Sequence, residues 1–189
     1  MRKELTGFIL IFLVIITSAS LLTYSSEDPS IHHAVSGGQI HNFFGFFGAH
    51  LAGFFIGLFG LGAFWIPLLF LVASFHILKT GRLKINVIAM TGGFILILTT
   101  GALLAFFQSN YNLFGNTYSA AGLIGSPVSS FFMKFASSAG GTLILIFFFC
   151  IGFILSTGFS VVKILKFFIT SIKNILDKIY FRISTYELD

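Results

Sequence analysis

The sequence predicts an all-α membrane protein: a polytopic helical bundle of four transmembrane helices, with an amphipathic helix after the last of them. Of its 189 residues, 56% are hydrophobic and only 9% are charged, whereas about a quarter of the residues in a soluble domain are charged. Several apolar runs reach the length of about 20 residues that crosses a bilayer as a helix. They lack the period-two alternation of a membrane β-barrel, and within such runs only a helix satisfies every backbone group.

The first predicted span covers residues 5–24 and follows a short charged start, Met1 to Glu4. Ser18-Ala19-Ser20 loosely resembles the small-residue site of a cleaved signal peptide, which is the alternative reading. The apolar run is longer than the hydrophobic region of a usual signal peptide. We therefore favour an uncleaved first span.

The next apolar run, residues 43–78, contains no Lys, Arg, Asp or Glu and is too long for one helix perpendicular to the membrane. Its first part, residues 43–53, has closely spaced glycines and His50. We expect this part at the membrane interface or in the mouth of the bundle. The second span is then predicted over residues 54–78, with a kink at Pro67 that a membrane helix tolerates.

The third and fourth spans are predicted over residues 86–107 and 139–162, where long apolar runs recur. A mixed segment separates them, and residues 127–135 within it have the composition of a short surface helix. Turn-forming residues follow the third span: Asn110, Asn112, Gly115 and Asn116.

The basic residues predict the orientation of the spans. Ten of the 11 Lys and Arg residues lie in the loops and ends of one side, and Lys134 alone lies on the other. Cytoplasmic loops carry such an excess, so both termini are expected in the cytoplasm. The net charge of +5 is therefore explained by topology and not by a nucleic-acid-binding face.

Residues 163–183 predict an amphipathic helix, because Leu165, Phe168, Ile172 and later isoleucines recur at three- and four-residue spacing. We favour a position on the inner leaflet, with lysines on anionic headgroups. A stalk that packs against copies of itself is the alternative. The chain thus divides into a membrane domain, residues 1–162, and a cytoplasmic helix or start of a linker, residues 163–189.

Small residues at four-residue spacing predict close helix contacts, since they let backbones approach each other in a membrane. Two such stripes occur: Ala49, Gly53 and Gly57 in one, and Gly152, Ser156 and Ser160 in the other. We favour packing within one chain over packing between subunits.

The residues do not predict a catalytic, cofactor-binding or metal-binding site. Four histidines, His32, His33, His41 and His50, fall in or near the first outer link, but no second group of Cys, Asp or Glu supports a metal site. The predicted spans contain no Asp, Glu, Lys or Arg, which proton and ion pathways usually need, and no phosphate-binding Gly-x4-Gly-Lys-Ser/Thr motif occurs. The pattern favours a membrane anchor and assembly module. A small transporter or channel subunit, with Gln108 and Asn110 on a neutral solute path, is the alternative.

Short motifs in a fixed order carry a family resemblance. After the first span come Tyr24-Ser25-Ser26-Glu27-Asp28-Pro29-Ser30, then Asn-x-x-Gly-x-x-Gly-Ala from Asn42, then Phe59-Gly60 with a proline beyond it. This order resembles the N-terminal four-span membrane domain of FtsK/SpoIIIE-type DNA translocases. The matching residues are Asp28, Pro29, Asn42, Gly45, Gly48, Ala49, Phe59, Gly60, Ala63 and Pro67. Gly122-Leu123-Ile124-Gly125 resembles the family's glycine-leucine element before the last span.

The resemblance implies a bacterial inner-membrane protein of the division septum. In that family the membrane domain tethers a hexameric cytoplasmic ATPase, which pumps chromosomal DNA, and it contacts other division proteins. A homo-oligomer is therefore expected, with the lipid bilayer as its surroundings. ATP and DNA would be bound only by a motor beyond Asp189, so this chain is expected to be no enzyme and to need no cofactor. Whether it is a piece of a longer translocase or a stand-alone relative stays open.

Overall fold

The computed structural model describes residues 2–30, 39–80, 87–158 and 170. Nearly all of them belong to one compact unit, Met1–Thr157. In chain order its elements are α1 (Arg2–Leu22), α2 (Gly45–Phe59), a 3₁₀ helix η1 (Gly60–Phe64), α3 (Trp65–Thr80), α4 (Val87–Phe107), β1 (Asn110–Leu113), β2 (Asn116–Ser119) and α5 (Gly122–Thr157). The amphipathic helix predicted over residues 163–183 lies outside the described residues, as do His32, His33 and Ser160.

The all-α membrane fold is confirmed. Four helical stretches of the described chain are long and apolar enough to cross a membrane: Glu4–Leu22, Gly45–Thr80, Val87–Phe107 and Gly122–Thr157. The helices α1 and α4 begin and end within three residues of the predicted spans, because an uninterrupted apolar run defines each of them.

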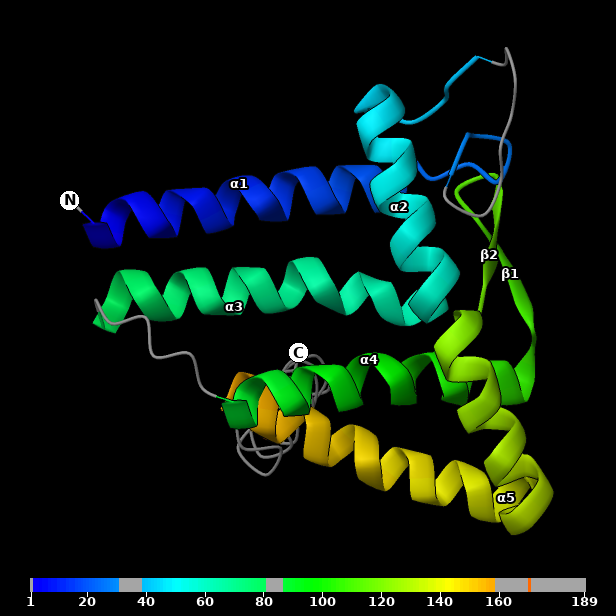
Figure 1. The fold of residues 1–189 in the computed structure, drawn as a ribbon. Coiled ribbons are helices and arrows are strands. Elements are labelled where there is room, and N and C mark those ends of the chain that lie inside the picture. The colour runs from blue at the N-terminus through cyan, green and yellow to red at the C-terminus, as the bar shows by residue number, and fades with distance from the viewer. Residues whose placement is uncertain (1, 31–38, 81–86, 159–169, 171–189) are drawn as a thin grey trace, which may run out of the picture. The chain divides into compact units, whose positions relative to one another are not determined.

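The helix predicted over residues 54–78 is wrong in its bounds and in the position of its bend. The chain forms α2 and α3 instead, and the break lies at Gly60, whose φ of 57° and ψ of −141° suit a glycine. Pro67 is the third residue of α3 and produces no break there, because the first N–H groups of a helix have no helical partner. Figure 1 shows α2 running crosswise to α1 and α3 at one end of both.

The fourth predicted helix, residues 139–162, also differs from the structure. The helix α5 begins at Gly122 and is interrupted at Ser137, whose φ of 59° and ψ of 175° are not helical. Its first part, residues 122–136, contains the predicted surface helix and runs crosswise, and its second part runs along α4 (Figure 1). The second part ends at Thr157, before Gly158 with its φ of 69°.

A β-hairpin stands where only turn-forming residues were predicted. β1 and β2 pair antiparallel with Leu113 opposite Asn116, so the loop consists of Phe114 and Gly115. Their φ values of 52° and 80° are those of a type I′ turn, which matches the twist of paired strands. The turn prediction is therefore correct for Gly115, but the three asparagines, Asn110, Asn112 and Asn116, lie in the strands.

The core forms where α2, η1 and β2 meet α1, α3 and α4. Its buried members are Leu21, Ala52, Ile56, Leu61, Ala63, Ile66, Ile97 and Tyr118. Along the long helices, α1 packs on α3 and α4 packs on α5. A Cβ atom on Gly152 of α5 would lie 2.8 Å from the backbone nitrogen of Leu96 in α4, so glycine permits that close helix contact.

Candidate functional site

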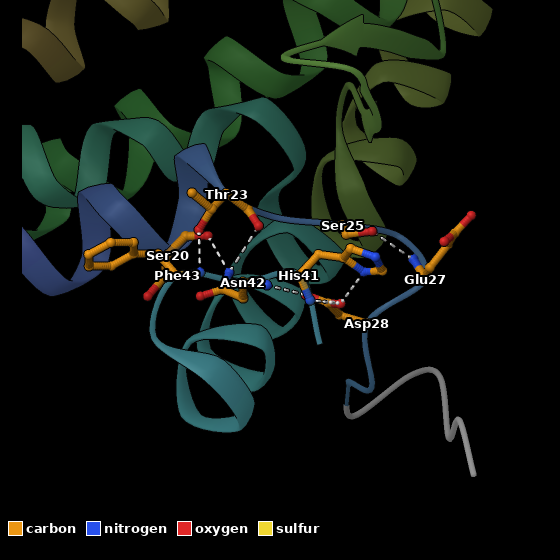
Figure 2. A network of polar contacts seen from close by, with 8 residues as sticks. All are labelled: Ser20, Thr23, Ser25, Glu27, Asp28, His41, Asn42 and Phe43. Atoms are coloured by element: carbon orange, nitrogen blue, oxygen red, sulfur yellow. Dashed lines mark hydrogen bonds and ion pairs between the residues drawn. The ribbon is translucent and has the colours of Figure 1, made fainter. Parts of the chain in front are cut away.

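Polar side chains gather at the junction between α1 and α2, and Figure 2 shows their contacts. We call Ser20, Thr23, Asp28, His41 and Asn42 the junction cluster. They come from the end of α1, from the loop after it and from the residues just before α2. Two of them, Asp28 and Asn42, belong to the motifs that carry the family resemblance.

The carboxylate of Asp28 is buried, with 2% of its side-chain surface exposed. Its Oδ1 accepts a hydrogen bond of 2.8 Å from the backbone N–H of His41, and its Oδ2 accepts one of 2.9 Å from that of Asn42. The His41 ring nitrogen Nδ1 lies 3.2 Å from Oδ1. A buried carboxylate requires such partners, and hydrogen bonds to a charged acceptor are stronger than neutral ones.

Asn42 ties the start of α2 back to the end of α1. Its Nδ2 donates to the backbone oxygens of Ser20 at 2.8 Å and Thr23 at 3.3 Å. The last carbonyl groups of a helix have no partner within the helix, so the Ser20 carbonyl needs an outside donor. Oδ1 of Asn42 accepts the N–H of Phe44 at 3.2 Å. A Cβ atom on Gly48 would lie 2.0 Å from the same Oδ1, so glycine at this position makes room for the asparagine.

A tyrosine pair attaches the hairpin to the same end of α1. The hydroxyl of Tyr118 donates to the backbone oxygen of Leu21 at 3.1 Å, and its ring lies 5.2 Å from that of Tyr24. Burial raises the pKa of Tyr24, and the nearby charge of Asp28 raises it further. Burial, and then Tyr24, also raise the pKa of Tyr118. Both hydroxyls therefore stay protonated at neutral pH, as the hydrogen bond from Tyr118 requires.

The corner between α2 and α3 is built from backbone contacts. A Cβ atom on Gly60 would lie 2.3 Å from the carbonyl oxygen of Ala120, and one on Gly122 would lie 2.5 Å from the nitrogen of Gly60. The N–H of Leu61 donates to that same Ala120 oxygen at 3.1 Å. The φ values of 57° at Gly60 and 62° at Gly122 add a second reason for glycine.

The structure thus brings five of the ten motif residues to two places. Asp28 and Asn42 belong to the junction cluster and Gly48 lies against Asn42, while Gly60 lies at the corner, where Ala63 is fully buried. The backbone N–H of Gly45 donates to the Asn42 carbonyl oxygen at 2.8 Å. No side-chain hydrogen bond is found for the other four motif residues: Pro29, Ala49, Phe59 and Pro67.

The two small-residue stripes contact segments of this same chain. A Cβ atom on Gly53 would lie 2.4 Å from Cβ of Ser30, and one on Gly92 would lie 2.7 Å from the nitrogen of Ser156. Gly57 is half-buried.

Sequence reasoning missed Ser20, Thr23 and Tyr118 as partners in this region. No local pattern marks them, because their contacts join distant positions: Tyr118 and Leu21 are 97 residues apart. Among residues 2–30, 39–80 and 87–158, no group of three or more His, Cys, Asp or Glu side chains has the geometry of a metal site. The hydrogen bonds of the junction cluster fix backbone positions, which is a structural role.

These features define a class: a multi-span helical membrane protein with a bilayer as its surroundings. At one end of its long helices, α2, the hairpin and residues 122–136 form a cap that is held by hydrogen bonds and close backbone contacts. The family described as the 4TM region of DNA translocase FtsK/SpoIIIE matches residues 1–169. The chain belongs to this family, so the resemblance inferred from the motifs is confirmed.

Two curated relatives are similar over most of this chain. DNA translocase FtsK of Vibrio parahaemolyticus serotype O3:K6 (strain RIMD 2210633) is 31% identical over 166 residues, which cover 87% of this chain and 16% of that protein. DNA translocase FtsK of Vibrio vulnificus (strain CMCP6) is 32% identical over 156 residues, covering 79% of this chain and 15% of that protein. The chain therefore spans only about a sixth of their length. No solved structure matches it significantly.

Proposed function

We propose that this chain is the membrane anchor and assembly domain of a bacterial septal DNA translocase, which acts in cell division and chromosome segregation. The observation that carries the proposal is the family match over residues 1–169, which coincides with four apolar helices. In this account the ATPase motor belongs to another region of such a translocase. The chain itself contributes anchoring, without catalysis and without a cofactor.

The distribution of charge supports a cytoplasmic attachment point. Ten of the 11 Lys and Arg residues lie on one side of the predicted spans, and such an excess marks the cytoplasmic side. With an even number of spans, both termini then lie in the cytoplasm of a bacterium, at its inner membrane. A motor that follows the last helix would then lie in the cytoplasm, where DNA and ATP are present.

The contacts within the cap support the role of an anchor. The junction cluster holds α2 against α1, and the close contact of Gly60 with Ala120 and Gly122 holds the end of α2 against the start of α5. A force on one helix is therefore transmitted to the others through short backbone contacts. A motor that moves DNA exerts force on its anchor, and a unit whose helices are tied to each other resists being pulled apart. We further propose that copies of this unit assemble into a homo-oligomer, with a hexamer as the state, and that they contact other division proteins.

Imaging tests the proposal directly. A fluorescent protein fused after Asp189, expressed at low level in dividing bacteria, should be enriched at mid-cell relative to the lateral membrane. A matched control is the same fusion to an unrelated four-span protein, which should label the membrane evenly. Even labelling by both fusions, with correct insertion of both, would contradict the septal role.

A further inference from the structure

Two short helices of this chain have matching special positions. Each position in the second helix lies 77 residues after its counterpart in the first. The pairs are Asn42 and Ser119 before the helix, Gly45 and Gly122 at its first residue, Gly48 and Gly125 one turn later, and Gly60 and Ser137 at the break that ends it.

The local geometry of the two helix starts is also similar. Gly45 and Gly122 have φ values of 58° and 62°. The side-chain oxygen of Asn42 accepts an N–H two residues on, and the hydroxyl oxygen of Ser119 accepts one three residues on, at 3.2 and 3.1 Å. The breaks that end the helices have φ values of 57° at Gly60 and 59° at Ser137.

Each of these helices connects two long helices. α2 lies between α1 and α3, and residues 122–136 lie between the hairpin after α4 and the second part of α5. Both run crosswise to their long helices, at the end where the hairpin lies (Figure 1). Each has 15 residues, a length of about 22 Å, which is shorter than the bilayer core of about 30 Å. Neither helix alone crosses a membrane.

The two helices share an exposed aromatic edge. Phe54 and Phe131 are equivalent by the same 77-residue spacing, and their side chains are 38% and 55% exposed. One turn after Phe131, Phe135 is 69% exposed and its ring lies 4.8 Å from that of Phe131. The opposite side of each helix is buried on the rest of the unit, through Gly48 in α2 and Gly125 in α5.

The crosswise part of α5 has in addition a polar edge. Ser126, Ser130 and Lys134 follow each other at four-residue spacing and are all exposed. Lys134 extends over the ring of Phe135, with its Nζ 5.7 Å from the ring centroid. A helix with one polar and one aromatic edge is typical of the membrane interface, where it lies in the plane of the bilayer.

We propose that α2 and residues 122–136 are a pair of interfacial helices whose aromatic edges, centred on Phe54 and Phe131, insert among the acyl chains just beneath the lipid headgroups. The partner is the phospholipid of the leaflet at the hairpin end. Lipid is the occupant because exposed apolar side chains continue along the long helices: Leu22 of α1 and Phe107 of α4, the last residues of these helices at the hairpin end, are 45% and 77% exposed. The Ser126–Lys134 edge then faces the headgroups and water. This inference goes beyond the proposed function and does not depend on it.

Depth-dependent fluorescence quenching tests the proposal. Trp65 is the only tryptophan of the chain, so a Trp65→Phe background allows one probe at a time. The probes are Phe54→Trp and Phe131→Trp, and the control is Phe12→Trp in the middle of α1. Each purified variant is placed in vesicles of phosphatidylcholine and phosphatidylglycerol brominated either near the headgroup or near the chain end. Circular dichroism and gel filtration confirm that each is folded.

The two equivalent probes should be quenched alike, and about twofold more by bromine near the headgroup than by bromine near the chain end. The Phe12→Trp control should show the reverse order. Three results would overturn the proposal. Unquenched, red-shifted emission would place the edges in water. Unquenched, blue-shifted emission would place them against protein, as in contact with a second copy. Strongest quenching from the chain ends would place them deep in the bilayer.

Spin labels give a second measurement, which leaves Trp65 unaltered. In a Cys150→Ser background, which removes the only cysteine, nitroxides are attached to Ser130→Cys and, separately, to Phe131→Cys. These neighbours lie on different edges of one helix. Oxygen, which concentrates in lipid, should relax the label at position 131 more, and a water-soluble nickel complex should relax the label at 130 more. Equal accessibility of both labels, or the opposite order, would contradict the interfacial position.

Discussion

The backbone N–H of Asn42 donates a hydrogen bond of 2.9 Å to the side chain of Asp28, which lies 14 residues earlier in the chain. Asp28 lies after α1, and Asn42 lies just before α2 and bonds back to α1 through its own amide. The pair therefore fixes where the crosswise helix begins relative to the first long helix. Each residue can be tested separately.

The substitution Asp28→Asn should lower the free energy of unfolding by about 2 kcal/mol. It removes the charge, and its amide group places N–H donors against one of the two backbone donors that the carboxylate now accepts. Reversible denaturation in mixed micelles with increasing dodecyl sulfate measures the change. Glu27→Gln is the matched control, because Glu27 is exposed, and it should have little effect. Equal stability of Asp28→Asn and the parent would show that the carboxylate does not hold the junction.

The substitution Asn42→Asp keeps the shape of the side chain but replaces its donor group by an acceptor. The new oxygen would face the carbonyl oxygens of Ser20 and Thr23, and leaving a buried carbonyl unpaired costs about 1–3 kcal/mol. We expect a loss of about that size, together with faster proteolysis of the chain between α1 and α2. His41→Ala should be milder, since its side chain is 55% exposed. An unchanged proteolysis rate for Asn42→Asp would refute the role of its amide.

The substitution Gly60→Ala should be the most harmful of the single-methyl changes at glycines with positive φ. It combines an unfavourable backbone conformation, about 1 kcal/mol, with a methyl group placed 2.3 Å from the Ala120 oxygen. Gly45→Ala is the matched control: its φ of 58° is nearly the same, and nothing lies within 4 Å of the new methyl group. If both variants lose the same stability, the close contact at the corner has no energetic role.

The pKa of Tyr118 is raised in the folded protein, which predicts a dependence of stability on alkaline pH. A raised folded-state pKa contributes stability that is complete below the unfolded value of about 10 and is lost as the pH rises through the folded value. Tyr118→Phe should therefore be less stable than the parent by about 1 kcal/mol at neutral pH, and this difference should shrink above about pH 10. Thermal unfolding in detergent across this range measures it. A difference that stays constant would show that the hydroxyl does not titrate as the structure requires.

A leucine at Gly152 should separate α4 from α5, since even a Cβ atom there would lie 2.8 Å from the backbone of α4. We expect reduced helix packing, seen as a lower unfolding temperature in detergent. Gly140→Leu is the control in the same helix, because a Cβ atom at Gly140 has only ordinary contacts, at 3.6 Å and beyond. Equal effects at the two positions would mean that the close contact is not what matters.

The long helices were predictable from sequence because each rests on an apolar run that only a helix can place in a membrane. The breaks were not. Pro67 is the stronger local signal for a bend, yet the chain bends at Gly60, and the cause lies in Ala120 and Gly122 far along the sequence. The motif order singles out Gly60 among the 20 glycines, but nothing local marks it as the position of the bend. Short-range patterns report local preference, whereas this corner is set by tertiary packing.

The candidate site was predictable in part, for a similar reason. The order of the motifs singles out Asp28 and Asn42, although it does not indicate that the two residues are in contact. The hairpin was missed because four-residue strands rich in asparagine look like turns, and Tyr118 was missed because only the fold brings it to Leu21. Ser20 and Thr23 contribute mainly backbone oxygens, which no side-chain pattern reveals.

The central claim is that this chain serves as the membrane anchor of a DNA translocase, and replacement tests it most directly. In Vibrio vulnificus, whose DNA translocase FtsK is 32% identical to this chain over 156 residues, residues 1–189 would replace the matching membrane region, and cell division and chromosome segregation would be counted. The parent sequence should restore both, and the Asn42→Asp replacement should restore them less well. An unrelated four-span protein, inserted at the same level, should restore neither. Failure of the parent replacement, despite correct insertion and an intact motor, would contradict the account.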